Sequence, residues 1–145
     1  MTYAEPSKAA LHELLEQSHT IAMVGASSNP ERESHLIFER LLRVGYQVIP
    51  VNPRETEVLG QKAYGSLEEI PVHVDIVDVF RKAEETPAIA ESAVKIGAGA
   101  LWLQQGIVND EAARIASEGG LIVVMDKCLA TAHTLMGVPK RPSQA

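Results

Sequence analysis

The chain has 145 residues, of which 46% are apolar and only 4% aromatic, so it can form one compact domain whose core is filled by Val, Ile, Leu and Ala. Its formal charge of -6, from 13 Lys and Arg against 19 Asp and Glu, provides no basic field for DNA or RNA and excludes nucleic acid as an expected partner. Its single cysteine cannot form an internal disulfide, and the lack of a long apolar run predicts a cytoplasmic protein with no signal peptide and no contact with a membrane.

The first half of the chain alternates helical patterns with short apolar runs. An N-terminal segment, 1–18, contains a helix that Ser7 caps, and a later helix stops at Gly45. The predicted elements are, in chain order, a helix over Ser7–Gln17, a strand over Thr20–Val24, a helix from Ser34 to Val44 and a strand over Tyr46–Val51. This order is typical of βαβ units, which build a parallel sheet.

The second half continues the alternation after a less regular stretch, Pro53 to Pro71, in which Ser66–Glu69 predicts a short capped helix. The further elements are a strand over Val74–Phe80, a helix over Glu84–Ile96, a strand over Ala100–Leu103, a helix over Asn109–Glu118 and a strand over Leu121–Val124. Residues 138–145 are expected to form a flexible tail. The pattern predicts a single α/β domain over 1–145, with a mainly parallel five-stranded sheet and helices on both faces.

The loop after the first predicted strand is a candidate phosphate-binding loop. In an open parallel sheet, ligands bind beyond the carboxyl ends of the strands, and small residues before a helix let backbone amides approach a phosphate. The candidate residues here are Gly25, Ala26, Ser27, Ser28 and Arg32. The loop lacks the later glycines of the dinucleotide fingerprint and the Gly-Lys-Ser/Thr of a P-loop, so an ordinary strand-to-helix turn is an equal alternative at this point.

The second strand ends in Asn52, Pro53 and Arg54. An NAD site would offer an acidic residue here for the ribose hydroxyls, whereas the guanidinium of Arg54 suits a phosphorylated ribose. The alternative is that Arg54 only solvates a turn.

The next two strand ends also carry candidate ligand contacts. The third strand ends in Val79, Phe80 and Arg81, where the Phe80 ring can flank an adenine or pack in the core and Arg81 can reach a phosphate. The fourth is followed by two amides and a glycine: Gln104, Gln105 and Gly106. Four strand ends with small, amide or cationic groups together indicate a ligand groove.

The remaining titratable residues suggest no catalytic or metal centre. The five histidines lack metal-ligand spacing, so a solvated surface position is favoured for most of them. Asp75 and Asp78 are expected to play structural roles. For Cys128, a buried small hydrophobe is favoured over a reactive thiol, although its place after the last strand also allows a thiol beside the groove.

Together these segments resemble those of the small stand-alone CoA-binding proteins, which are similar to the N-terminal domain of succinyl-CoA synthetase alpha subunits. The matching segments are Ile21–Pro30, Gly45–Arg54, Val74–Arg81, Trp102–Gly106 and Val124–Cys128. The resemblance implies a Rossmann-like three-layer domain in which the first loop holds pyrophosphate, the Asn52–Arg54 turn meets the adenosine end, and the later loops line the groove. The chain departs from the family in Glu33, where proline is frequent, and in Leu129–His133, which lacks an acidic residue before the histidine.

The resemblance implies non-catalytic binding of coenzyme A or acyl-CoA, with a protein partner or a homodimer as further expectations. Synthetases that share this domain add a second domain with a phosphorylated histidine and a partner subunit, so ligase activity is not expected of this chain alone. The alternatives are an NADP-dependent oxidoreductase, which would need a substrate domain and a catalytic group, and a regulatory subunit with a vestigial groove.

Overall fold

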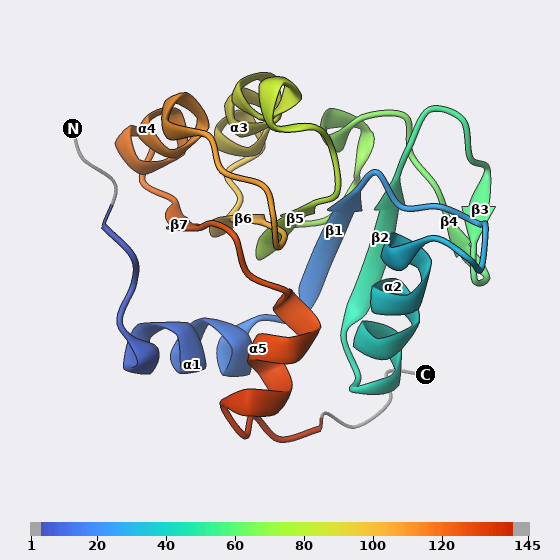
Figure 1. Ribbon diagram of the computed structural model, residues 1–145. Helices are drawn as coiled ribbons and strands as arrows, with labels where there is room; N and C mark the ends of the chain where they lie inside the picture. Colours follow the sequence, from blue (N-terminus) through green and yellow to red (C-terminus); the bar gives the residue numbers. More distant parts are fainter. Residues whose placement is uncertain (1–3, 141–145) are drawn as a thin grey trace.

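A computed structural model describes residues 4–140 of the chain and shows a five-stranded sheet whose strands are all parallel (Figure 1). The sheet strands are β1 (Thr20–Val24), β2 (Gln47–Val51), β5 (Ile76–Val79), β6 (Ala100–Leu103) and β7 (Ile122–Val124). Their spatial order is β2-β1-β5-β6-β7. The predicted fold class, a Rossmann-like α/β domain, is confirmed.

Helices cover both faces of the sheet (Figure 1). One layer holds α1 (Lys8–Gln17), α2 (Glu33–Arg43) and α5 (Leu129–Leu135), and the other holds α3 (Thr86–Lys95) and α4 (Asp110–Glu118). Successive strand residues alternate between the layers, so Met23 packs with the first layer and Ala22 with the second. Burial on both faces explains why these strands are almost wholly apolar.

Two helices begin at the predicted capping residues, and two begin elsewhere. The Ser7 hydroxyl accepts a hydrogen bond from the Ala10 amide, and the Asn109 side chain accepts one from the Ala112 amide. The second helix begins at Glu33 rather than Ser34, and the third begins at Thr86, after a turn of 3-10 helix over Ala83–Glu85.

Two elements were not predicted. A small hairpin pairs β3 (Glu57–Val58) with β4 (Gln61–Lys62) around Leu59 and Gly60, which both have positive φ, as tight hairpin turns require. The other is α5, whose seven residues give too short a pattern to distinguish from a loop. The short helix near Ser66 is present as 3-10 helix over Leu67–Glu69, but the Ser66 hydroxyl bonds to the Glu69 carboxylate instead of a backbone amide.

The predicted tail from residue 138 is wrong at its first position, because Val138 is buried against the first helical layer. Residues 141–145 lie outside the described part of the chain. Within residues 4–140, no helix has the length and apolar character that crossing a bilayer requires.

Candidate functional site

The connections of the sheet diverge between β1 and β5. From β1 the chain runs to β2 at one edge, and it then returns to place β5 on the other side of β1. In doubly wound sheets such a switch point opens a crevice at the carboxyl ends of the strands. Here a groove of about 900 Å³ lies at that place, lined by Val24 and Gly25 at the end of β1, Asn52 to Glu55 after β2, and Phe80 after β5.

The packing of the chain at the switch point requires a glycine at position 25. Its φ is +91°, and a Cβ at this position would lie 2.4 Å from the carbonyl oxygen of Phe80. Its amide also donates to the carbonyl of Val51. From the sequence, this glycine was expected to let a phosphate approach the backbone. The structure adds an internal reason: β1 and β5 can end this close together only without a side chain here.

The loop from Gly25 to Arg32 is fixed from both sides. The Asn52 side-chain amide donates to the Ala26 carbonyl at 2.9 Å, and the His35 ring lies 2.9 Å from the Ser27 carbonyl. The amide and the hydroxyl of Ser28 both donate to one carboxylate oxygen of Glu55, at 2.9 and 3.0 Å. Glu55 therefore occupies a backbone donor that an incoming phosphate could use, a role that the sequence did not reveal.

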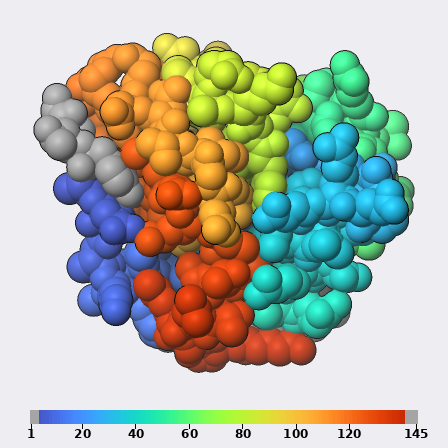
Figure 2. All heavy atoms as spheres, in the orientation of Figure 1, coloured from blue at the N-terminus to red at the C-terminus, as the bar shows by residue number. Residues whose placement is uncertain are grey.

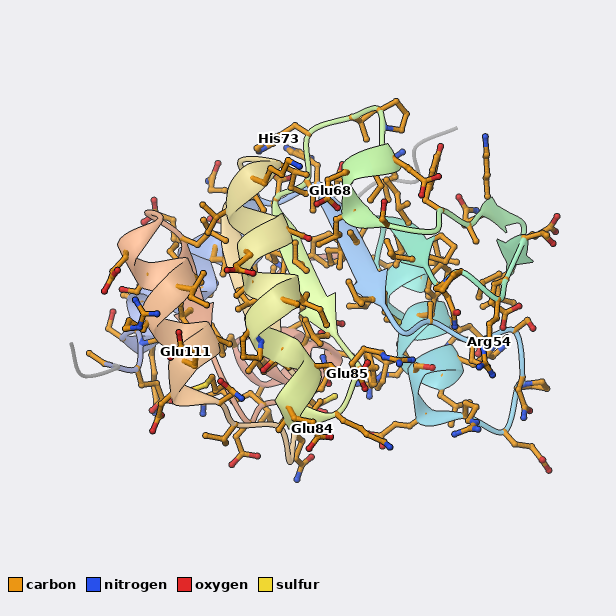
Figure 3. All side chains as sticks on the ribbon, turned by 90° about the horizontal axis from the view of Figure 1, so that it is seen from above. Arg54, Glu68, His73, Glu84, Glu85 and Glu111 are labelled. Carbon is orange, nitrogen blue, oxygen red and sulfur yellow. The ribbon has the colours of Figure 1, made fainter. Side chains whose placement is uncertain are left out.

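Three arginines line the groove, from three different loops: Arg32, Arg54 and Arg81. Arg81 is bonded to Glu85 at 2.8 Å, and this contact lowers the pKa of the Glu85 carboxyl. The side chains of Arg32 and Arg54 make no ion pair or hydrogen bond with another described residue. Seen from above the sheet, Arg54 lies beside α2 and the hairpin, and Glu85 lies at the start of α3 (Figure 3). Two cations are therefore available to an anionic ligand.

A second hollow of about 380 Å³ continues the groove towards β6. It shares four residues with the first: Glu33, Phe80, Arg81 and Glu85. Its other lining residues are Lys82, Gln104, Gln105 and Ile107. The segments after β1, β5 and β6 meet at the surface in Figure 2. The site is thus one elongated groove across four strand ends.

A buried polar pair lies beneath the second hollow. Asp78 is fully buried on β5, and the Gln104 side-chain amide donates to its Oδ1 at 2.5 Å. Burial raises the pKa of the Asp78 carboxyl to about 7, although the bond from Gln104 acts in the opposite direction. Sequence reasoning gave Asp78 a structural role and did not pair it with Gln104. The available signal was an aspartate within an apolar strand and a glutamine just after the neighbouring strand.

Ten of the fourteen candidate residues line the groove. The first hollow contains Gly25, Ser27, Arg32, Asn52, Pro53, Arg54, Phe80 and Arg81, and the second contains Gln104 and Gln105 in addition to Phe80 and Arg81.

The other four candidates lie outside this lining. Ala26 and Val79 are completely buried in opposite layers of the core, Val79 because it points to the other face from Phe80. Ser28 is tied to Glu55, and the Gly106 amide donates to the Asp126 carboxylate.

Cys128 lies elsewhere. It precedes α5 and lines a separate hollow of about 660 Å³ between α1 and α5, where it is neither buried nor among the groove residues. Cys128 is half-buried and packs against the core of the first layer, so the expectation of full burial is wrong, and so is the alternative placement beside the groove. His133 is buried and packs edge-on against Tyr46. Within the described residues, no three His, Cys, Asp or Glu side chains gather as a metal site would require.

The order of strands and the groove at their switch point define a doubly wound α/β protein of the Rossmann type, whose groove lies where such folds bind their ligands. A family model described as a CoA binding domain matches residues 19–134. The chain therefore belongs to the CoA-binding domain family.

Relatives of two kinds share this domain. An uncharacterized protein, YneT of Bacillus subtilis (strain 168), is 45% identical over 130 residues, which are 90% of this chain and 96% of that protein. The alpha subunit of an ADP-forming acetate–CoA ligase II from Pyrococcus furiosus is 31% identical over 79% of this chain, but the match spans only 27% of the subunit. Among solved structures, a hypothetical protein from Pyrococcus horikoshii OT3 is 38% identical, with a TM-score of 0.88 over 94% of this chain and 99% of that one.

Proposed function

We propose that this protein binds coenzyme A or an acyl-CoA non-covalently in the groove at the carboxyl ends of the strands, without catalysing a reaction itself. The observation that carries the proposal is the convergence of Arg32, Arg54 and Arg81 on the groove beside the Gly25 loop, in a chain of this family. Coenzyme A carries three phosphate groups at one end, which arginines and backbone amides bind well.

The two hollows match the two ends of this ligand. The larger one has the arginines and suits the phosphorylated adenosine, and the smaller one, with Gln104 and Gln105, suits the uncharged arm with its amides and thiol. The proposal includes no catalysis. Arg81 is paired with Glu85, and the one hydroxyl that donates to a groove carboxylate, that of Ser28, is held together with its own backbone amide on Glu55 and lies outside the described groove lining, so this contact fixes the loop.

Calorimetric titration tests this function directly. Purified protein stripped of carried-over ligand is titrated with CoA, acetyl-CoA, NADP and ATP. We expect CoA and acetyl-CoA to bind at least tenfold more tightly than the two nucleotides, about 1.4 kcal/mol or more in binding free energy. Tighter binding of NADP would instead favour the oxidoreductase, and no binding of any ligand would favour a regulatory subunit with a vestigial groove.

The 3′-phosphate of CoA is expected to contribute through Arg54, whose guanidinium has no partner among the described residues. Dephospho-CoA should bind about tenfold more weakly than CoA, because a charge-assisted contact is lost. Arg54→Ala should weaken CoA binding by a similar factor and should abolish the preference for CoA over dephospho-CoA. The matched control is Arg43→Ala, at the far end of α2, where the arginine pairs with Glu39 and with no other described residue. An Arg54 variant that keeps the full preference would disprove the assignment.

Glu55 is expected to oppose phosphate binding. In Glu55→Gln the side chain keeps an oxygen for the Ser28 amide but loses its negative charge, so CoA affinity should rise by about three- to tenfold. Glu57→Gln, on the exposed hairpin outside the groove lining, controls for the change in net charge. Unchanged or weaker binding in the Glu55 variant alone would mean that the carboxylate is needed to hold the loop.

A further inference from the structure

The Asp78–Gln104 pair places a titratable carboxyl one side chain away from the groove. Asp78 lies on β5 in register with Met23 of β1 and Trp102 of β6, and its exposed fraction is 0%. Gln104 follows β6 and is 3% exposed, yet it lines the second hollow. A single hydrogen-bonded residue, Gln104, therefore connects the Asp78 carboxyl to the groove.

Each member of this pair has one oxygen without a hydrogen-bond partner. Gln104 Nε2 donates to Asp78 Oδ1, while Asp78 Oδ2 and Gln104 Oε1 are buried with no hydrogen-bond partner among the described residues. Two acceptor oxygens cannot satisfy each other. A proton on Oδ2 makes the carboxyl a donor to Oε1 and closes a cyclic acid–amide pair in which all four polar atoms are bonded. Burial favours this neutral form.

We propose that Asp78 is a positioning residue: its protonated carboxyl forms a cyclic pair with the Gln104 carboxamide, and loss of that proton weakens the binding of an anionic ligand in the groove. This inference rests on the proposed function for its ligand, CoA. In the neutral pair the buried Oε1 of Gln104 has its donor, and the second N–H of the carboxamide stays outside the pair. The ionised pair puts an uncompensated negative charge beneath a groove that is to hold a polyanion.

Burial and the hydrogen bond from Gln104 are the two main influences on the pKa of the Asp78 carboxyl. The strand neighbours in register, Met23 and Trp102, carry no charge. The titratable groups on the surrounding elements include Glu33 and His35 in the first turn of α2, Arg81, Lys82 and Glu85 after β5, Asp126 and Lys127 after β7, and His133 on α5. Of these, Arg81 is bonded to Glu85, Asp126 to the Gly106 amide, and Lys127 to Glu5.

An infrared titration of the ligand-free protein tests the pair whether or not CoA binds. The difference spectrum between wild type and Asp78→Asn should contain the carbonyl stretch of a protonated carboxylic acid at about pH 6, and this band should disappear by about pH 8. Gln104→Leu removes both hydrogen bonds of the pair, so the acid band should move to the higher frequency of a carboxylic acid without a hydrogen-bond partner. Absence of an acid band from the wild-type spectrum at about pH 6 would overturn the proposal.

The pH dependence of CoA binding tests the link to the groove. The carboxamide introduced by Asp78→Asn can donate to Gln104 Oε1 and accept from Nε2, so this variant imitates the protonated pair at every pH. The ratio of the wild-type to the Asp78→Asn dissociation constant should rise about tenfold from about pH 6 to about pH 8, and taking the ratio cancels the titration of the ligand's own phosphate.

Asp75→Asn is the matched control for this experiment. Asp75 accepts the His19 and Thr20 amides at the opposite end of β5, so its variant should follow the wild-type pH profile. Parallel profiles for wild type and Asp78→Asn would overturn the link to the groove. Failure of every variant to bind CoA would instead reject the proposed function, and the infrared titration would still decide whether the pair is protonated.

Discussion

Replacing Asp78 with Asn is expected to remove a loss of stability of about 4 kcal/mol that the wild-type protein undergoes between about pH 4 and pH 7. The pKa of this carboxyl rises from an ordinary value of 3.8 to about 7 on folding, because the group is buried. Between those values the unfolded carboxyl is ionised while the folded one keeps its proton, so a rising pH favours the unfolded chain. Above about pH 7 both forms are ionised and the loss stays constant.

The measurement is the free energy of unfolding by urea from about pH 4 to pH 8, for wild type and Asp78→Asn. The difference between the Asp78 variant and wild type should grow by about 4 kcal/mol over this range and then level off. A constant difference between Asp78→Asn and wild type would show that the carboxyl ionises equally in both states.

Gly25→Ala is expected to destabilise the fold by about 3 kcal/mol or more and to weaken CoA binding at least tenfold. The new Cβ would meet the Phe80 carbonyl at 2.4 Å, which forces apart the ends of β1 and β5 and moves the loop that begins there. Urea unfolding and calorimetric titration measure the two effects.

Gly97→Ala separates steric conflict from backbone strain. Gly97 also has a positive φ, +73°, but nothing lies within 4 Å of its added Cβ, and it lies after α3, outside the groove. The free energy of unfolding of Gly97→Ala should fall by about 1 to 2 kcal/mol, because alanine is strained in a left-handed backbone conformation, and the variant should bind CoA as wild type does. If both variants lost the same stability, the conflict with Phe80 would be relieved without movement of the strands.

The sheet and its helices could be predicted because their signals are local. Each sheet strand is a short apolar run, and each long helix has an apolar face with a stop or a cap, as at Asn109. The hairpin at Glu57–Lys62 and the seven-residue α5 escaped prediction because each is too short to establish a period. Tertiary contacts hold both: Tyr64, just after the hairpin, bridges to Val51 of β2, and Leu129 and Ala130 of α5 are buried in the core of the first layer.

The candidate site could be predicted only as far as the strand ends. The rule that ligands bind there identified the arginines and the glutamines, which line the groove in the structure. The rule does not say which residues of a strand end point towards the groove. Val79 was therefore predicted as a site residue, although its side chain points to the opposite face from Phe80. The contacts of Glu55 with Ser28 and of Gln104 with Asp78 join residues 27 and 26 positions apart, and no local pattern reports such pairs.

The layer formed by α1, α2 and α5 draws on both halves of the chain, and this has a consequence for synthesis on the ribosome. Leu129, Ala130 and Val138 complete the core over Phe38 and Tyr46. The indole N–H of Trp102 finds its acceptor only in the carbonyl of Lys127. Because the chain emerges from its amino end, β1 and α2 are made early but wait for the last helix before their apolar faces are covered. The opposite layer, made mostly of residues 67–125, can close first, so the strand synthesised first is among the last to be shielded from water on its α2 side.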